Sequence, residues 1–158
     1  MVGQWQERAR NYPRGLAIAV VEGHGRIEQF WRWRMLVDRD NPLLIAREFT
    51  RVASQLLSIV HALNGRYCGH PSAFKRLDTF ERDLPLAPNR LSTRLRRAFT
   101  LPTPDGAEIL RELVEETYDL VEVHLPEVDV ARLRDLFRFE RQPLERPPSP
   151  DDTVSPSV

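Results

Sequence analysis

The chain has 158 residues, of which 41% are hydrophobic and 29% are charged, a composition typical of one globular domain with a modest core. No stretch approaches the roughly 20 apolar residues of a membrane-spanning helix, and charged residues interrupt the N-terminal segment where a signal peptide would be apolar. The single cysteine, Cys68, excludes an internal disulfide framework and a zinc site built from several cysteines. We therefore expect a soluble, cytoplasmic protein with no membrane partner.

The formal net charge is zero, but the charges are unevenly distributed along the chain. Residues 1–100 contain 17 Lys and Arg against 9 Asp and Glu, whereas residues 101–158 contain 6 against 14. Either the acidic part packs near the basic part and offsets its charge, or the basic part binds an anion such as a nucleotide phosphate or RNA. We favour the first interpretation, because charge alone does not show where the arginines point.

A first helix is predicted from Pro13, a favourable first-turn residue, to about Val37. Gly23 and Gly25 flank His24 inside this helix. Each glycine costs about 1 kcal/mol relative to alanine in a helix interior, so we expect a kink or break near His24.

The strongest helical pattern runs from about Pro42 to Leu63, with Asn41 as its N-cap. Its apolar residues recur every three or four positions, as in a helix packed lengthwise in a bundle: Ile45, Phe49, Val52, Leu56, Ile59 and Leu63. Further apolar residues widen this seam on both sides, which predicts a central helix with several neighbours. Asn64 and Gly65 are typical helix-ending residues.

The remaining pattern predicts four more helices. They are a short helix around Ser72 to Glu81, a helix at about Asn89–Thr100 that buries Leu91, Leu95 and Phe99, a long helix from Thr103 to about Leu125, and a final helix at about Val128–Phe139. Residues 141–158 are rich in proline and are expected to be disordered. The sequence thus predicts an all-α bundle of about five to six helices over residues 1–140, followed by a disordered tail.

Recognisable catalytic motifs are missing from this pattern. Asp38 and Asp40 have the spacing of a metal-binding carboxylate pair, but they lie in a predicted turn between helices. The four histidines fall at no ligand spacing, and no glycine-rich phosphate loop is present. We therefore expect no catalytic residue, no metal site and no cofactor.

One face of the central helix is polar in an unusual way. It carries Arg47, Arg51, Ser54, Ser58 and His61, where an exposed face would favour Glu and Lys. Small hydroxyls beside guanidinium groups are suited to a polar pocket or an interface. A plain solvated face remains the slightly favoured alternative.

A second polar cluster follows the end of this helix. Asn64, Arg66 and Tyr67 lie at the turn, and Lys75 follows eight residues later. Arg and Lys can bind a phosphate while Tyr stacks on a base. A helix cap followed by a surface loop explains the same residues without any ligand.

The segments that carry these features resemble a known family. Tyr12-Pro13, the apolar helix around Leu16 to Val21, the stretch Ala62-Leu63-Asn64-Gly65-Arg66-Tyr67 and Lys75 resemble the C-terminal helical region of bacterial nucleotidyltransferase-like proteins. These belong to the DNA polymerase β superfamily and are distant relatives of aminoglycoside nucleotidyltransferases. The resemblance covers about residues 4–125. In that family a separate α/β domain precedes the helices and carries a Gly-Ser pair and acidic residues that hold magnesium and the nucleotide.

The resemblance implies a helical domain that closes over an active site and binds an acceptor or a partner. This chain shows no counterpart of the α/β domain, so we expect a non-catalytic substrate- or partner-binding domain. The expected partner is a nucleotidyltransferase catalytic domain, a nucleotide or a small anionic substrate, and a homo-oligomer is left open. The candidate binding residues are Asn64, Arg66, Tyr67, Lys75, Arg47 and Arg51.

Two other functions remain as alternatives. In the first, the chain is a fragment of a two-domain enzyme that transfers a nucleotidyl group to a small acceptor. In the second, it is a helical ribonuclease of the toxin type. The ribonuclease is disfavoured, because Arg51 with His61 and Arg66 with His70 do not have the spacing of an Arg-His pair on one helix.

Overall fold

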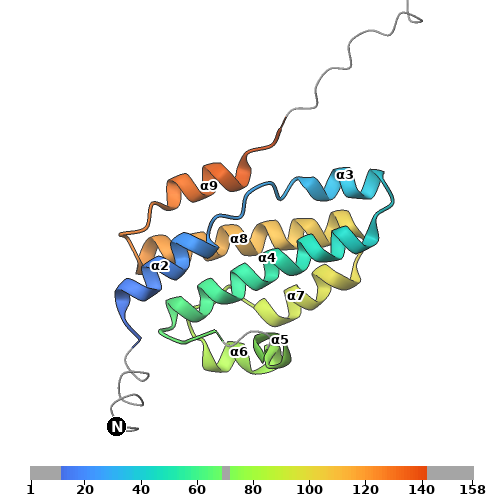
Figure 1. Cartoon of the computed structure of the whole chain (residues 1–158). Coiled ribbons are helices and arrows are strands. Elements are labelled where there is room, and N and C mark those ends of the chain that lie inside the picture. Colours follow the sequence, from blue (N-terminus) through green and yellow to red (C-terminus); the bar gives the residue numbers. More distant parts are fainter. Residues whose placement is uncertain (1–11, 69–71, 142–158) are drawn as a thin grey trace, which may run out of the picture.

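The computed structural model describes residues 12–68 and 72–141, and over these residues all regular elements are helices. Figure 1 shows an elongated bundle in which α4 (Pro42–Leu63) and α8 (Thr103–His124) lie side by side along its length. Three shorter helices run antiparallel to them: α2 (Arg14–His24), α7 (Leu91–Thr100) and α9 (Val130–Arg138). The predicted all-α bundle is confirmed.

The predicted break in the first helix is confirmed. Helix α2 ends at His24, and α3 (Arg32–Asp38) begins only after an irregular connector. Gly25 leaves no space for a side chain, because an added Cβ would lie 2.5 Å from the carbonyl oxygen of Val21 and 2.8 Å from Leu133. The connector is tied to the core by Ile27 and Phe30, which are both buried.

Helix α4 has the predicted bounds, and both of its ends follow from local chemistry. The Asn41 side chain accepts a hydrogen bond of 3.3 Å from the amide of Leu44 at the N-terminus. At the C-terminus Gly65 adopts a φ of +62°, and the amides of Gly65 and Arg66 donate to the carbonyls of Ala62 and His61. This is the glycine-dependent C-cap that satisfies the last carbonyls of a helix.

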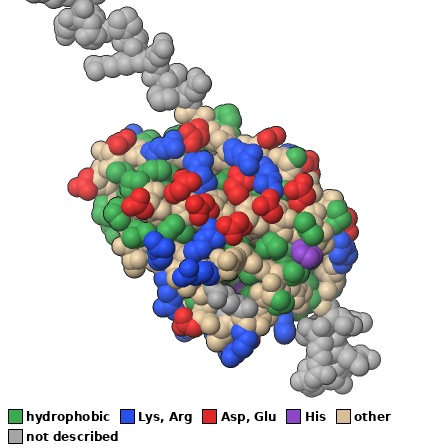
Figure 2. Space-filling model, turned by 180° about the vertical axis from the view of Figure 1, so that it is seen from behind, with side chains coloured by type: hydrophobic (Ala, Val, Ile, Leu, Met, Phe, Trp, Pro, Cys, Tyr) green, Lys and Arg blue, Asp and Glu red, His purple; other side chains and the backbone are tan. Residues whose placement is uncertain are grey.

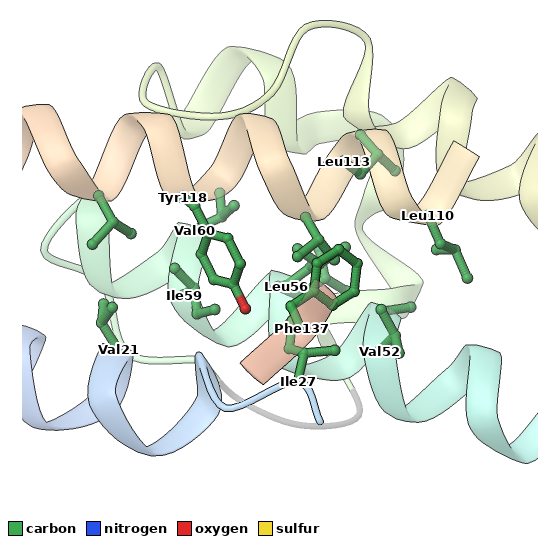
Figure 3. Packing of buried hydrophobic residues seen from close by; sticks show 14 of the residues in the cluster. Val21, Ile27, Val52, Leu56, Ile59, Val60, Leu110, Leu113, Tyr118 and Phe137 are labelled. Carbon is green, nitrogen blue, oxygen red and sulfur yellow. The ribbon is translucent and has the colours of Figure 1, made fainter. Parts of the chain in front are cut away.

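The core lies between α4 and α8 and is closed by α2, the connector and α9 (Figure 3). Leu56, Leu110 and Tyr118 are fully buried within it. The hydroxyl of Tyr118 donates a 2.7 Å hydrogen bond to the carbonyl of Gly25, so the largest buried side chain also fixes the end of α2. The prediction that α4 is the central helix is confirmed, because it packs against α2, α3, α7 and α8.

Three details differ from the sequence prediction. The predicted helix at Ser72–Glu81 consists of two short helices, α5 (Ser72–Lys75) and α6 (Leu77–Asp83). On α7 the residue that completes the buried face is Ala98, whereas Phe99 is 45% exposed. Of the predicted tail, residues 141–158, all but Arg141 lie outside the described residues.

No helix in the described part of the chain is both long enough and apolar enough to cross a membrane.

Candidate functional site

Five of the six candidate residues occupy two separate parts of α4 and the turn that follows it, and the sixth, Lys75, lies on α5. Asn64, Arg66 and Tyr67 lie at the C-terminal turn, whereas Arg47 and Arg51 lie in the N-terminal half. A rise of about 1.5 Å per residue puts about 20 Å of helix between Arg51 and Asn64. The structure therefore does not bring these two groups into one pocket.

Asn64 has a structural role at the end of α4. Its side-chain amide donates to the carbonyls of Val60 and Leu86, at 2.7 and 2.9 Å, and accepts from the amide of Leu86 at 2.9 Å. These three bonds join the end of the central helix to the connector before α7. The amide is fully engaged within the protein, so a ligand has no free group on it to bind.

Arg66 and Tyr67 lie on the surface beside this turn. Arg66 is exposed and forms no ion pair with any described residue. Tyr67 is 55% exposed, and its ring packs edge-on against Tyr12 with centroids 4.9 Å apart. Tyr12 therefore fixes one edge of the Tyr67 ring while more than half of that side chain stays open to solvent.

The neighbourhood of Tyr67 disfavours negative charge on the protein itself. Burial raises the pKa of the Tyr12 hydroxyl, and the neighbouring Tyr67 and Cys68 raise it further. Burial also raises the pKa of the Cys68 thiol, although a hydrogen bond with Ser58 opposes this shift. Both groups are therefore neutral near pH 7, so they do not compete with an external anion for Arg66.

Lys75, at the end of α5, is exposed and has no ion-pair partner among the described residues. Its preceding residue, Phe74, lines an apolar groove between α4, α6 and α7. Within the described part of the chain, no hydrogen bond or ion pair links Lys75 to Arg66. Lys75 thus extends the basic surface towards this groove.

Arg51 is engaged in a network that fixes the connector between α2 and α3. Its guanidinium contacts Glu48 at 2.9 Å, Gln55 at 2.8 Å and the carbonyl of Glu28 at 3.3 Å. Arg47, one turn earlier, is exposed and forms no ion pair with the described residues. Of the two arginines, Arg47 is the one with a free charge.

The other members of the predicted polar stripe do not line a pocket through their hydroxyls. Ser54 and Ser58 donate to the carbonyls of Thr50 and Ser54 in the same helix. His61 is buried, and its Nδ1 lies 2.6 Å from the carbonyl oxygen of Leu57, which requires a proton on that nitrogen. The stripe is therefore a partly buried helix face with internal hydrogen bonds.

Sequence reasoning missed a polar cleft of about 520 Å³ beside Arg51, which Arg26, Glu28, Gln29 and Arg32 also line. Gln29 has a φ of +59°, in the left-handed region that non-glycine residues rarely adopt. No sequence signal marks it, because the buried Ile27 and Phe30 on either side impose the turn. Arg26 and Arg51 already pair with Glu28 and Glu48 in this cleft.

The favoured interpretation of the uneven charge accounts for only part of it. Arg94 of α7 contacts Glu112 and Glu116 of α8 at 2.9 and 2.7 Å. Other acidic residues of α8 pair instead with Arg134 and Arg138 of α9, which belong to the acidic part of the sequence. Figure 2 shows acidic and basic side chains intermingled on the upper part of one face, while basic side chains gather on its lower part.

The acidic and histidine residues form no metal-binding group of three or more among the described residues. Asp38 and Asp40 are exposed around the turn between α3 and α4, where the sequence placed them. Comparisons with family models, with curated proteins and with solved structures find no match to this chain.

Proposed function

We propose that this helical bundle is a non-catalytic binding domain of the nucleotidyltransferase type. It binds an anionic ligand, such as a nucleotide or the anionic substrate of a partner catalytic domain, at the turn that follows α4. The residues assigned to binding are Arg66 and Lys75 for charge and Tyr67 for stacking. Asn64 holds the turn in place but does not itself contact the ligand.

One observation carries this proposal: Tyr67 and Arg66 are adjacent on a fixed turn, where Tyr67 is 55% exposed and Arg66 has no ion pair with any described residue. The turn is fixed by Gly65 and by the three hydrogen bonds of Asn64. A rigid turn loses little conformational freedom on binding, which favours affinity. An aromatic face beside a guanidinium suits a base linked to a phosphate.

The test compares the wild type with the double variant Arg66→Ala plus Lys75→Ala, using a fluorescent ATP analogue as the probe. We expect the Kd of the variant to be about tenfold higher, because each exposed charge contributes up to about 1 kcal/mol. The difference should shrink as salt is added. The free energy of unfolding should change by no more than about 0.5 kcal/mol, because both side chains are exposed.

A matched control variant removes the same number of positive charges from another part of the surface. Arg39 and Arg132 are exposed and have no ion pair with the described residues, so Arg39→Ala plus Arg132→Ala removes two free cations far from the turn in sequence. Equal weakening in both double variants would show a nonspecific charge effect. Unfolding of the Arg66 and Lys75 variant would show that these residues stabilise the fold, and the site assignment would then be wrong.

A further inference from the structure

An apolar groove of about 500 Å³ opens on the surface between α4, α6 and α7. Its walls are Ala53 of α4, Leu77 of α6, and Leu95 and Phe99 of α7, together with Phe74 of α5. The groove is separate from the α4 turn discussed above, because none of Asn64, Arg66 and Tyr67 lines it.

The groove exposes apolar surface that the bundle itself does not cover. Phe99 is 45% exposed, although its ring is held perpendicular to that of the buried Phe49, with centroids 5.9 Å apart. Leu43 is 82% exposed and lies seven residues before Thr50, a lining residue, on the same face of α4. One exposed apolar side chain, Leu43, therefore lies on the α4 face that leads away from the groove.

Basic residues flank the groove and this face of α4. Arg96 lines the groove itself, Arg47 lies on α4 between Leu43 and Thr50, and Lys75 and Arg76 separate Phe74 from Leu77. Arg96 pairs with Asp78 at 2.5 Å on the surface. The other three cations are exposed and have no ion pair with the described residues, so the rim of the groove has a net positive charge.

We propose that this groove binds an acidic amphipathic helix of a partner protein. Such a helix lays an apolar face into a groove and uses anchors spaced by three, four or seven residues. Leu95, which is 2% exposed, forms part of the groove floor, and Phe99 stands one turn further along α7 and is 45% exposed, so an apolar anchor of the partner can rest against Phe99 over this floor. Glutamates beside those anchors would compete with Asp78 for Arg96 and would also meet the exposed Arg47 further along α4, a complementarity that speeds association.

A second copy of this chain fits the groove less well than an acidic helix of another protein. Its own acidic helix, α8, has already buried its apolar face: Leu110, Val114 and Tyr118 are fully buried in the core. That helix cannot offer apolar anchors without unfolding the bundle. A nucleic acid is also disfavoured, because the described residues that line the groove are mostly apolar and include one cation, Arg96.

The first experiment varies the partner and leaves the protein unchanged. The probe is a fluorescein-labelled helical peptide with two leucines four residues apart and glutamates on both flanks. One control peptide replaces every glutamate with lysine, and another replaces both leucines with serine. Fluorescence anisotropy should show binding of the acidic peptide alone, with a Kd that rises with salt.

The second experiment inverts the charge preference of the groove. Arg47→Glu plus Arg96→Glu should raise the Kd for the acidic peptide at least about tenfold and should make the lysine peptide the tighter ligand. Phe99→Ala should weaken both interactions. Arg39→Glu plus Arg132→Glu, with the same change in charge, should leave the acidic peptide bound as in the wild type, and thermal melting should show that each variant is folded.

Three results would overturn this proposal. Equal binding of the acidic and lysine peptides to the wild type would assign the groove to an apolar ligand without charge preference. A wild-type dimer that Phe99→Ala dissociates in sedimentation would assign it to a second copy. If the wild type does not bind the acidic peptide at low salt, the groove does not have this function. The peptide comparisons use the wild-type protein, so they remain valid even if a variant fails to fold.

Discussion

Asn64 shows how one side chain can look like a binding residue in sequence and serve the fold in structure. Its amide bonds to Val60 in its own helix and to Leu86, 22 residues later. Sequence reasoning places an Asn-Gly pair at a helix end, and the structure confirms that Gly65 supplies the left-handed residue there. The distant partner Leu86 could not be predicted, because it depends on how the connector folds back.

We expect Asn64→Ala to lower the free energy of unfolding by about 1–3 kcal/mol, because the partly buried backbone amide and carbonyl of Leu86 lose their hydrogen-bond partner. Asn64→Asp keeps the acceptor for the Leu86 amide but loses both donated bonds, so it should destabilise as well. Urea unfolding at neutral pH measures both changes. If both variants unfold at the same urea concentration as the wild type, Asn64 does not stabilise the fold. It would then again be a candidate for ligand binding.

At the scale of single elements, the sequence predicted a helix correctly where its capping residues and its apolar periodicity indicate the same bounds. Helix α4 has Asn41 at one end, Gly65 at the other and an unbroken seam between them, and its bounds are as expected. The buried face of helix α7 was predicted less well. Ala98 and Phe99 are adjacent, and the apolar pattern of so short a helix does not show which of them faces the core. That choice depends on where α8 lies.

The close approach of α7 and α8 depends on Gly106. A Cβ at this position would lie 2.2 Å from the carbonyl oxygen of Ala98 and 3.0 Å from the ring of Phe49. Because the nearest obstacle is backbone, the two helices would have to move apart. Gly23, by contrast, has nothing within 4 Å of an added Cβ.

We therefore expect Gly106→Ala to destabilise the protein by about 1–3 kcal/mol or more through overpacking. The matched change Gly23→Ala should stabilise it by about 0.5–1 kcal/mol, because alanine has the higher helix propensity and the site is open. Urea unfolding of both variants measures the pair. Equal effects of the two substitutions would mean that α7 and α8 are not packed at this distance.

At the scale of the whole molecule, the charges of α8 are largely committed to neighbouring helices. Glu112 and Glu116 pair with Arg94, and Glu115 pairs with Arg134 and Arg138. Carboxylates held by arginines in this way are not arranged to bind the two metal ions that neutralise phosphate charge in nucleotidyl transfer.

We accordingly expect the purified chain alone to transfer no nucleotidyl group from any nucleoside triphosphate, with magnesium or manganese present. Transfer of an α-labelled phosphate group to small acceptors measures this directly. The control is a nucleotidyltransferase with an intact catalytic domain under the same conditions. Turnover that Asp38→Asn plus Asp40→Asn abolishes would contradict the expectation and place the chemistry at the turn between α3 and α4.

The sequence by itself determined the all-α class, the position and bounds of the central helix and the break after His24, because caps, glycines and apolar period are local properties of the chain. Only the tertiary structure decided that Asn64 holds a connector, that Arg51 is engaged while Arg47 is free, and that Phe99 remains at the surface. These outcomes depend on which helices pack together and at what distance. Residues far apart in the sequence jointly determine that packing. The same dependence explains why the six candidate residues are dispersed. Arg47 and Arg51 lie on α4, at a distance from the turn that carries Asn64, Arg66 and Tyr67, and Lys75 lies on α5.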